Sequence, residues 1–150
     1  MEKAKRRGAA GFTAALAVCL MGALAPASAD EGAVDYRQNT MAAVGGHMHA
    51  AVDILRGKVS HSGHMALHAG ALSDLAGIAG TLFPEGSAGG DSLPAIWENG
   101  DDFAERLAAF EESAANFATA AESGDAGAIG TAFQGLGQAC KSCHDDYRAQ

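Results

Sequence analysis

Residues 125–148, DAGAIGTAFQGLGQACKSCHDDYR, carry the most regular apolar pattern in this chain. Apolar and cysteine side chains recur there at intervals of three and four residues, the spacing of one helical face. The positions on that face are Ile129, Phe133, Leu136, Cys140, Cys143 and Tyr147. Asp125 stands where a carboxylate can cap the start of the helix. The stretch therefore predicts a helix whose core-facing stripe includes two cysteines.

The two cysteines belong to the run Cys140-Lys141-Ser142-Cys143-His144, a Cys-x-x-Cys-His motif typical of covalent haem attachment. On a helix, both thiols can reach the haem edge while His144 offers a ring nitrogen to the iron. A dithiol redox pair fits poorly because no strand-helix-strand pattern surrounds it, and a zinc site would need a fourth ligand. We therefore expect one covalent haem c, attached through Cys140 and Cys143, with His144 as its axial ligand.

Three more segments show helical periodicity. The first runs from Val34 to about Gly57, and its apolar face is Met41, Val44, Met48, Val52 and Leu55. The second runs from about Ser62 to Leu82, and its expected core stripe is Leu67, Ala71, Leu75, Ile78 and Leu82. After a glycine-rich connector, the third carries Phe103, Leu107, Phe110, Ala114, Phe117 and Ala121. The predicted fold class is all-α, an antiparallel four-helix bundle with covalently attached haem c among its helices.

The N-terminus has the features of a secretory signal peptide. Four basic residues precede an apolar stretch, 9–25, and Ala27-Ser28-Ala29 supplies a small-x-small cleavage site. We expect residues 1–29 to be removed, Cys19 among them. Residues 30–150 would then form one haem domain in the periplasm, without a membrane span.

The charge of the chain limits its partners. The sequence has ten Lys plus Arg and eighteen Asp plus Glu, a net charge of −8. Removal of a leader with four basic residues and one acidic residue would change this to −11. Such an acidic domain is unsuited to nucleic acid or to an anionic membrane surface. Basic redox proteins and small neutral molecules remain open as partners, and the sequence identifies no particular redox protein.

Short stretches outside the haem motif form a second pattern. They are Tyr36-Arg37-Gln38, Gly45-Gly46-His47-Met48, Phe83-Pro84-Glu85-Gly86, Gly90-Asp91, Ile96-Trp97-Glu98-Asn99 and Asp102-Phe103. With the run Cys140 to Arg148, they make the chain resemble cytochrome c′, the class II c-type cytochromes, over Val34 to Arg148. The resemblance implies a four-helix haem bundle, and a homodimer that packs through the first two helices.

The resemblance also implies haem contacts on the first helix. Arg37 and Gln38 match the pair that lies against the haem and its propionates. Arg37 could otherwise be a solvated surface arginine, but its phase beside Met41 suggests that its head finds a carboxylate such as a propionate. Met41 itself matches the position that faces the open side of the iron.

Two further residues are matched near the haem edge. Asp91 corresponds to a loop residue at that edge, and it would equally suit an N-cap before Leu93-Pro94. Arg148, one turn after His144, corresponds to a basic residue near the proximal face.

Met41 separates two functional hypotheses. If its thioether only fills the pocket, the iron is five-coordinate and high-spin, and the protein binds small gases, chiefly NO and CO, and can also pass electrons. If the thioether binds iron, the protein is a six-coordinate, low-spin electron-transfer cytochrome with Met41 and His144 as axial ligands. The resemblance favours the first hypothesis.

No acid-base pair or nucleophile constellation is evident, so we predict no enzyme with a defined substrate, while NO-detoxifying or weak peroxidase activity stays open.

Five histidines lie outside the haem motif, at positions 47, 49, 61, 64 and 68. His61, His64 and His68 are spaced three and four apart, which could hold zinc or copper, with Met48 or Met65 assisting copper. The simpler interpretation is that histidines at a helix start are solvated polar residues. The resemblance accounts for His47 without a metal, because it matches a position of the family.

Overall fold

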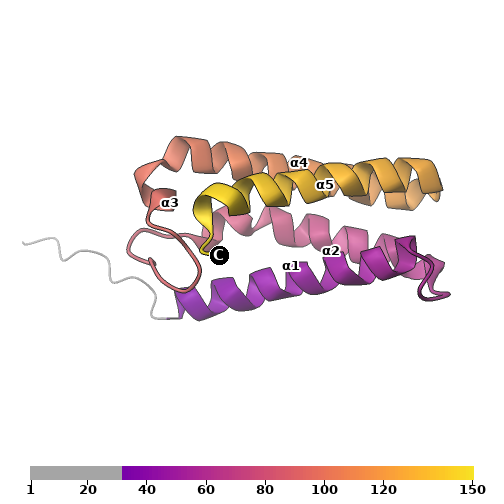
Figure 1. Ribbon diagram of the computed structural model, residues 1–150, viewed down its shortest axis with the longest axis horizontal. Helices are drawn as coiled ribbons and strands as arrows, with labels where there is room; N and C mark the ends of the chain where they lie inside the picture. The colour runs from indigo at the N-terminus through magenta and orange to yellow at the C-terminus, as the bar shows by residue number, and fades with distance from the viewer. Residues whose placement is uncertain (1–31) are drawn as a thin grey trace, which may run out of the picture.

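The computed structural model describes residues 32–150, so the predicted signal peptide, 1–29, lies outside the described residues. Four long helices make up the bundle: α1 (Ala33–Leu55), α2 (Met65–Gly77), α4 (Gly100–Ser123) and α5 (Ala126–Tyr147). Shorter elements are the 3₁₀ turns η1 (Ser62–His64) and η2 (Ala79–Leu82) and the single turn α3 (Ala95–Glu98). The long helices run alternately up and down (Figure 1). The predicted all-α, antiparallel four-helix bundle is confirmed.

The helix ends form where the sequence places turn residues. Gly57, just beyond α1, has a φ of 64°, and Gly124, which ends α4, has a φ of 70°. Both values lie in the left-handed region that glycine adopts without a steric penalty. The carboxylate of Asp125 accepts a hydrogen bond from the backbone N–H of Ala128 over 2.7 Å, which confirms it as the cap of α5. None of the helices in residues 32–150 is long and apolar enough to cross a membrane.

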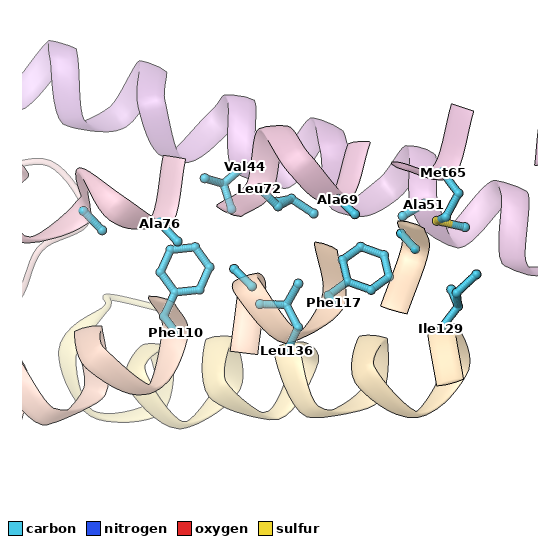
Figure 2. Packing of buried hydrophobic residues seen from close by; sticks show 13 residues of the cluster. Val44, Ala51, Met65, Ala69, Leu72, Ala76, Phe110, Phe117, Ile129 and Leu136 are labelled. Carbon is cyan, nitrogen blue, oxygen red and sulfur yellow. The ribbon is translucent and has the colours of Figure 1, made fainter. Parts of the chain in front are cut away.

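The predicted core faces of α4 and α5 are buried or half-buried. Phe110 and Phe117 point from α4 toward α2, and Leu136 packs beside them from α5 (Figure 2). Phe117, Leu72 and Leu136 are the largest side chains that are completely buried in the described part of the chain. The buried face of α4 alternates phenylalanines with alanines, which lets neighbouring helices interdigitate.

The predicted core stripe of 62–82 is partly wrong. Leu82 is buried and Leu75 packs against the core, as expected, but α2 is rotated about its axis from the expected orientation. Leu67 and Ile78 were expected inside but are 64% and 38% exposed. The buried face consists instead of Met65, Ala69, Leu72 and Ala76. Both series recur at three- and four-residue intervals, so periodicity could not separate them. The face that contains Ala69 and Ala76 packs toward the core, because small side chains let α2 lie close to α4.

The packing of the four helices leaves one side of the bundle open. Helix α1 packs on α2, α2 on α4, and α4 on α5. A cavity lies on the fourth side, between α1 and α5, lined by side chains from both. The connector 83–94 and the C-terminus both lie at one end of this side (Figure 1).

Candidate haem site

The cavity between α1 and α5 has a volume of about 660 Å³. That lies within the range of about 300–1,000 Å³ typical of ligand and cofactor pockets. Apolar side chains from α1, α4 and α5 form most of its wall, including Met48, Val52, Leu107, Phe110 and Phe133. The eight residues that the sequence assigned to the site all line it: Arg37, Gln38, Met41, Asp91, Cys140, Cys143, His144 and Arg148. The fold thus brings together residues that are up to 111 positions apart in the chain.

Cys140 and Cys143 lie half-buried on the cavity face of α5, and neither is in a disulfide. Burial raises the pKa of the Cys140 thiol. Burial, followed by the neighbouring Cys140, raises the pKa of Cys143 to about 11. Redox-active thiols have lowered pKa values, so these environments are unlike those of a catalytic dithiol. They suit thiols that stay protonated until they are joined to an apolar cofactor.

His144 lies on the last turns of α5 and remains exposed at the rim of the cavity. Desolvation lowers its pKa, and the positive charge of Arg148 lowers it further. The neutral imidazole is the form that binds a metal ion. The side chain of His144 is therefore available to bind a metal ion beside the two thiols.

Arg37 is buried, with only 3% of its surface exposed, so it is no solvated surface arginine. Its guanidinium donates hydrogen bonds to the backbone oxygens of Leu82, Ser87 and Gly89 and to the Ser87 hydroxyl, over 2.9–3.1 Å. It also lies 5.2 Å from the ring centroid of Phe83. None of the carboxylates in residues 32–150 forms an ion pair with Arg37. The cavity is thus bordered by a buried cation whose partners here are all neutral.

Gln38 packs against the connector beside Arg37. A Cβ atom at Gly90 would lie 2.6 Å from Nε2 of Gln38, and Gly90 has a φ of 59°. Only glycine satisfies both conditions without a shift of the backbone or of Gln38. The connector is therefore held against the start of α1 at the cavity edge.

Asp91 and Arg148 meet where the connector touches the C-terminus. Nε of Arg148 lies 3.9 Å from the Asp91 carboxylate, and the backbone N–H of Ala149 donates to the Asp91 carbonyl over 2.8 Å. The alternative role of Asp91 as an N-cap is wrong, because Pro94 occupies the N-cap of α3 and no side chain caps that turn. Both residues line the cavity where the connector meets the C-terminus.

The sequence analysis missed a polar network beside the cavity, and two of its members, Arg106 and Tyr147, line the cavity. The Tyr147 hydroxyl donates to the Asp102 carboxylate over 2.6 Å, and Arg106 forms ion pairs with Asp102 at 3.3 Å and with Asp146 at 3.5 Å. Tyr147 also contacts Phe103 edge-on. Tyr147 belonged to the predicted core stripe and Asp102 to the family pattern, but nothing in the linear sequence pairs them.

The histidines divide into two groups. His49, His61 and His64 are exposed, as expected for solvated residues. His47 on α1 and His68 on α2 are half-buried, and their Nδ1 atoms lie 3.0 Å apart. Desolvation, followed by the nearby His47 and His64, lowers the pKa of His68. Neither His47 nor His68 lines the large cavity.

The residues of the cavity fit a haem of the covalent type. Two thiols and an imidazole project from one helix, the facing wall is apolar, and a buried guanidinium without a carboxylate borders the edge. A haem would offer a flat apolar group to the apolar wall between α1 and α5 and carboxylates to the guanidinium at the edge.

Comparison with known proteins gives concordant results. A family model described as cytochrome c′ matches residues 32–148. Cytochrome c′ of Rhodospirillum rubrum is 32% identical over 141 residues, which cover 92% of this chain and 96% of that protein. The nitric oxide complex of a point mutant of cytochrome c prime from Alcaligenes xylosoxidans superposes with a TM-score of 0.75, at 29% identity, over 80% of this chain and 96% of that one. A carbon monoxide-bound variant of the same protein gives a TM-score of 0.76 at 28% identity, over 82% and 98% of the two chains.

Proposed function

Because this chain belongs to the cytochrome c′ family, whose members carry a covalently attached haem c, we propose that it is an exported haem protein that binds NO and CO. The proposed role is ligand binding, with electron transfer as a second use of the same haem, rather than conversion of a substrate. The observation that carries the proposal is the cavity between α1 and α5, which holds the haem-attachment motif on one wall and Met41 on the other. Similar proteins have been solved with nitric oxide and with carbon monoxide bound.

Each residue of the site has a proposed task. Cys140 and Cys143 would hold the haem through thioether links, and His144 would supply a ring nitrogen to its iron from the same helix. When bound, the haem supplies an iron ion with a coordination position that accepts a small gas. Arg37 supplies a buried positive charge toward the propionates, with Gln38 beside it.

Asp91 and Arg148 are proposed to control access at the haem edge. Their side chains are 55–66% exposed and 3.9 Å apart, so the pair lies between the cavity and solvent. Such an exposed pair contributes little to stability because water screens its charges. We propose that the pair instead holds the connector and the C-terminus together beside His144.

Met41 is proposed to crowd the open side of the iron without binding it. Its side chain is half-buried on α1, in a stretch of wall that it shares with Val44 and Met48. A methionine on a helix is well suited to fill an irregular apolar gap. The alternative is that its sulfur is the sixth ligand and the protein is a low-spin electron carrier.

The optical spectrum of the ferrous protein tests the proposal. We expect the bands of five-coordinate, high-spin haem in the absence of gas and a conversion to low-spin bands when CO is added. A low-spin spectrum before addition of gas, and failure of CO to change it, would replace the gas-binding proposal with the electron-carrier one.

Mass spectrometry of the protein from its native host tests export: the mature N-terminus should be at or next to Asp30.

A further inference from the structure

A second cluster of chemically capable side chains lies in the seam between α1 and α2. Nδ1 of His47 and Nδ1 of His68 face each other at 3.0 Å, and their ring centroids are 5.3 Å apart. His47 falls in the same helical series as the buried residues Val44 and Ala51, and His68 follows the buried Met65 by three positions. Two imidazoles therefore occupy seam positions where apolar side chains would ordinarily pack. Burial of polar groups has a cost unless partners satisfy them.

The distance between the two nitrogens is that of neighbouring ligands on one metal ion. Two nitrogens bound at about 2.0 Å to a tetrahedral ion lie about 3.3 Å apart. The observed 3.0 Å corresponds to an angle of about 97° at the metal with bonds of that length. An angle near 90° belongs to square-planar or tetragonal coordination, which Cu²⁺ prefers with imidazole ligands.

We propose that His47 and His68 form a two-histidine Cu²⁺ site in the α1–α2 seam, separate from the haem. No group of three or more His, Cys, Asp or Glu residues within 32–150 is positioned to hold a metal ion. The two imidazoles are thus the protein ligands, and water completes the coordination. The acidic chain, with a net charge of −8, favours the approach of a divalent cation.

Two neighbouring histidines define the limits of the site. His64 is close enough to lower the pKa of His68, but it is exposed and stacks on His61, with ring centroids 5.0 Å apart. Within residues 32–150, neither a hydrogen bond nor a ring contact joins His61 to the His47–His68 pair. It is therefore a matched control, a histidine from the same region that the proposal leaves outside the coordination sphere.

The site is tested by isothermal titration calorimetry, in which the haem-loaded protein is titrated with Cu²⁺ in a non-coordinating buffer. We expect one Cu²⁺ per chain, and at least about tenfold weaker binding for both His47→Ala and His68→Ala, because each variant loses a ligand. His61→Ala should bind as the wild type does. Pulsed EPR of the Cu²⁺-loaded protein, with the copper-free protein as baseline, should show two coordinated imidazoles in the wild type and one in either single variant.

Two results would contradict the proposed Cu²⁺ site. No Cu²⁺ binding by the wild type, or wild-type affinity in both His47→Ala and His68→Ala, would reduce the pair to a hydrogen bond between the two rings. His68→Gln keeps a polar side chain of similar size in the seam and serves if an alanine variant fails to fold. The haem spectrum, recorded in parallel, reports on the integrity of the bundle.

Discussion

The hydroxyl of Tyr147, three residues beyond His144, donates a hydrogen bond of 2.6 Å to the carboxylate of Asp102 on the first turn of α4. The bond joins the end of the haem-motif helix to the helix that forms the floor of the cavity. Tyr147 is also packed edge-on against Phe103, which in turn contacts Phe83 at 4.8 Å between ring centroids. The position of α5 at the motif thus depends on a contact 45 residues away in the chain.

Replacement of Tyr147 by Phe should lower the melting temperature in a pH-dependent manner. The hydrogen bond from Tyr147, and then that from Arg106, lowers the pKa of Asp102, and the same bond to Asp102 raises the pKa of Tyr147 to about 12. A lowered carboxyl pKa stabilises the fold above the ordinary value of about 4, and this stabilisation is lost as the pH falls through the lowered value. A raised tyrosine pKa stabilises the fold below about 10, and this stabilisation is lost as the pH rises toward 12.

The difference in melting temperature between wild type and Tyr147→Phe should therefore be largest from about pH 5 to pH 9 and shrink at both extremes. Thermal melts followed by circular dichroism across this range measure it. Any pH dependence of the melting temperature that arises from His144 cancels in this difference, because both proteins keep His144. If the difference in melting temperature at about pH 11 is as large as it is between about pH 5 and pH 9, the hydrogen bond from Tyr147 to Asp102 does not stabilise the fold as argued.

Removal of the Arg37 guanidinium should loosen the connector. Arg37→Ala deletes four hydrogen bonds to residues 82–89 and leaves buried carbonyl groups without donors. We expect a loss of about 3 kcal/mol in the free energy of unfolding. Hydrogen exchange of the connector amides should accelerate at the same time. The exposed Arg56, at the end of the same helix, is the control, and Arg56→Ala should change stability by less than about 0.5 kcal/mol.

Shortening of Met41 should open the proposed gas-binding side of the iron. If the side chain adds about 1.4 kcal/mol to the barrier for ligand entry, Met41→Ala should accelerate CO binding about tenfold in stopped-flow measurements. The ferrous spectrum should remain high-spin. O₂ should bind poorly throughout, because a thioether offers no hydrogen-bond donor to a polar bound ligand.

Met41→Leu is the matched control, since it keeps the bulk of the side chain and removes the sulfur. It should resemble the wild type in spectrum and in CO rate. A low-spin wild type that becomes high-spin in both Met41 variants would identify the sulfur as the sixth ligand.

The outer surface of α1 and α2 should form the contact of a homodimer. All of the large hydrophobic side chains that are exposed in the described part of the chain belong to these helices or adjoin them: Tyr36, Leu55, Val59, Leu67 and Ile78. Exposed apolar side chains concentrated on one pair of helices indicate an interaction surface. Sedimentation of the wild type at micromolar concentration should give about twice the chain mass.

A charge on this surface should separate the subunits. Leu67 is 64% exposed, so Leu67→Glu should yield monomers without disturbing the core. Ala108→Glu, on the exposed face of α4, should leave the dimer intact. A wild type that sediments as a monomer would remove the dimer and leave the haem site unaffected.

Local sequence pattern was sufficient for much of this protein. The spacing of Cys140, Cys143 and His144 specifies a haem-attachment motif, since the three side chains need only one helix to bring them together. The core faces of α4 and α5 were equally predictable, because their phenylalanines and leucines form a single apolar stripe. The turns at Gly57 and Gly124 follow from the backbone freedom of glycine.

Contacts between distant segments were decided by the tertiary structure. Two series of apolar residues run along α2 with the same period, and only its packing against α4 selects Met65 and Leu72 over Leu67. The four hydrogen bonds of Arg37, the bond from Tyr147 to Asp102, and the pairing of His47 with His68 join residues 21 to 52 positions apart. Periodicity describes which residues share a helix face, whereas the partner of that face depends on how whole helices pack and on the gap that α1 and α5 leave for the haem.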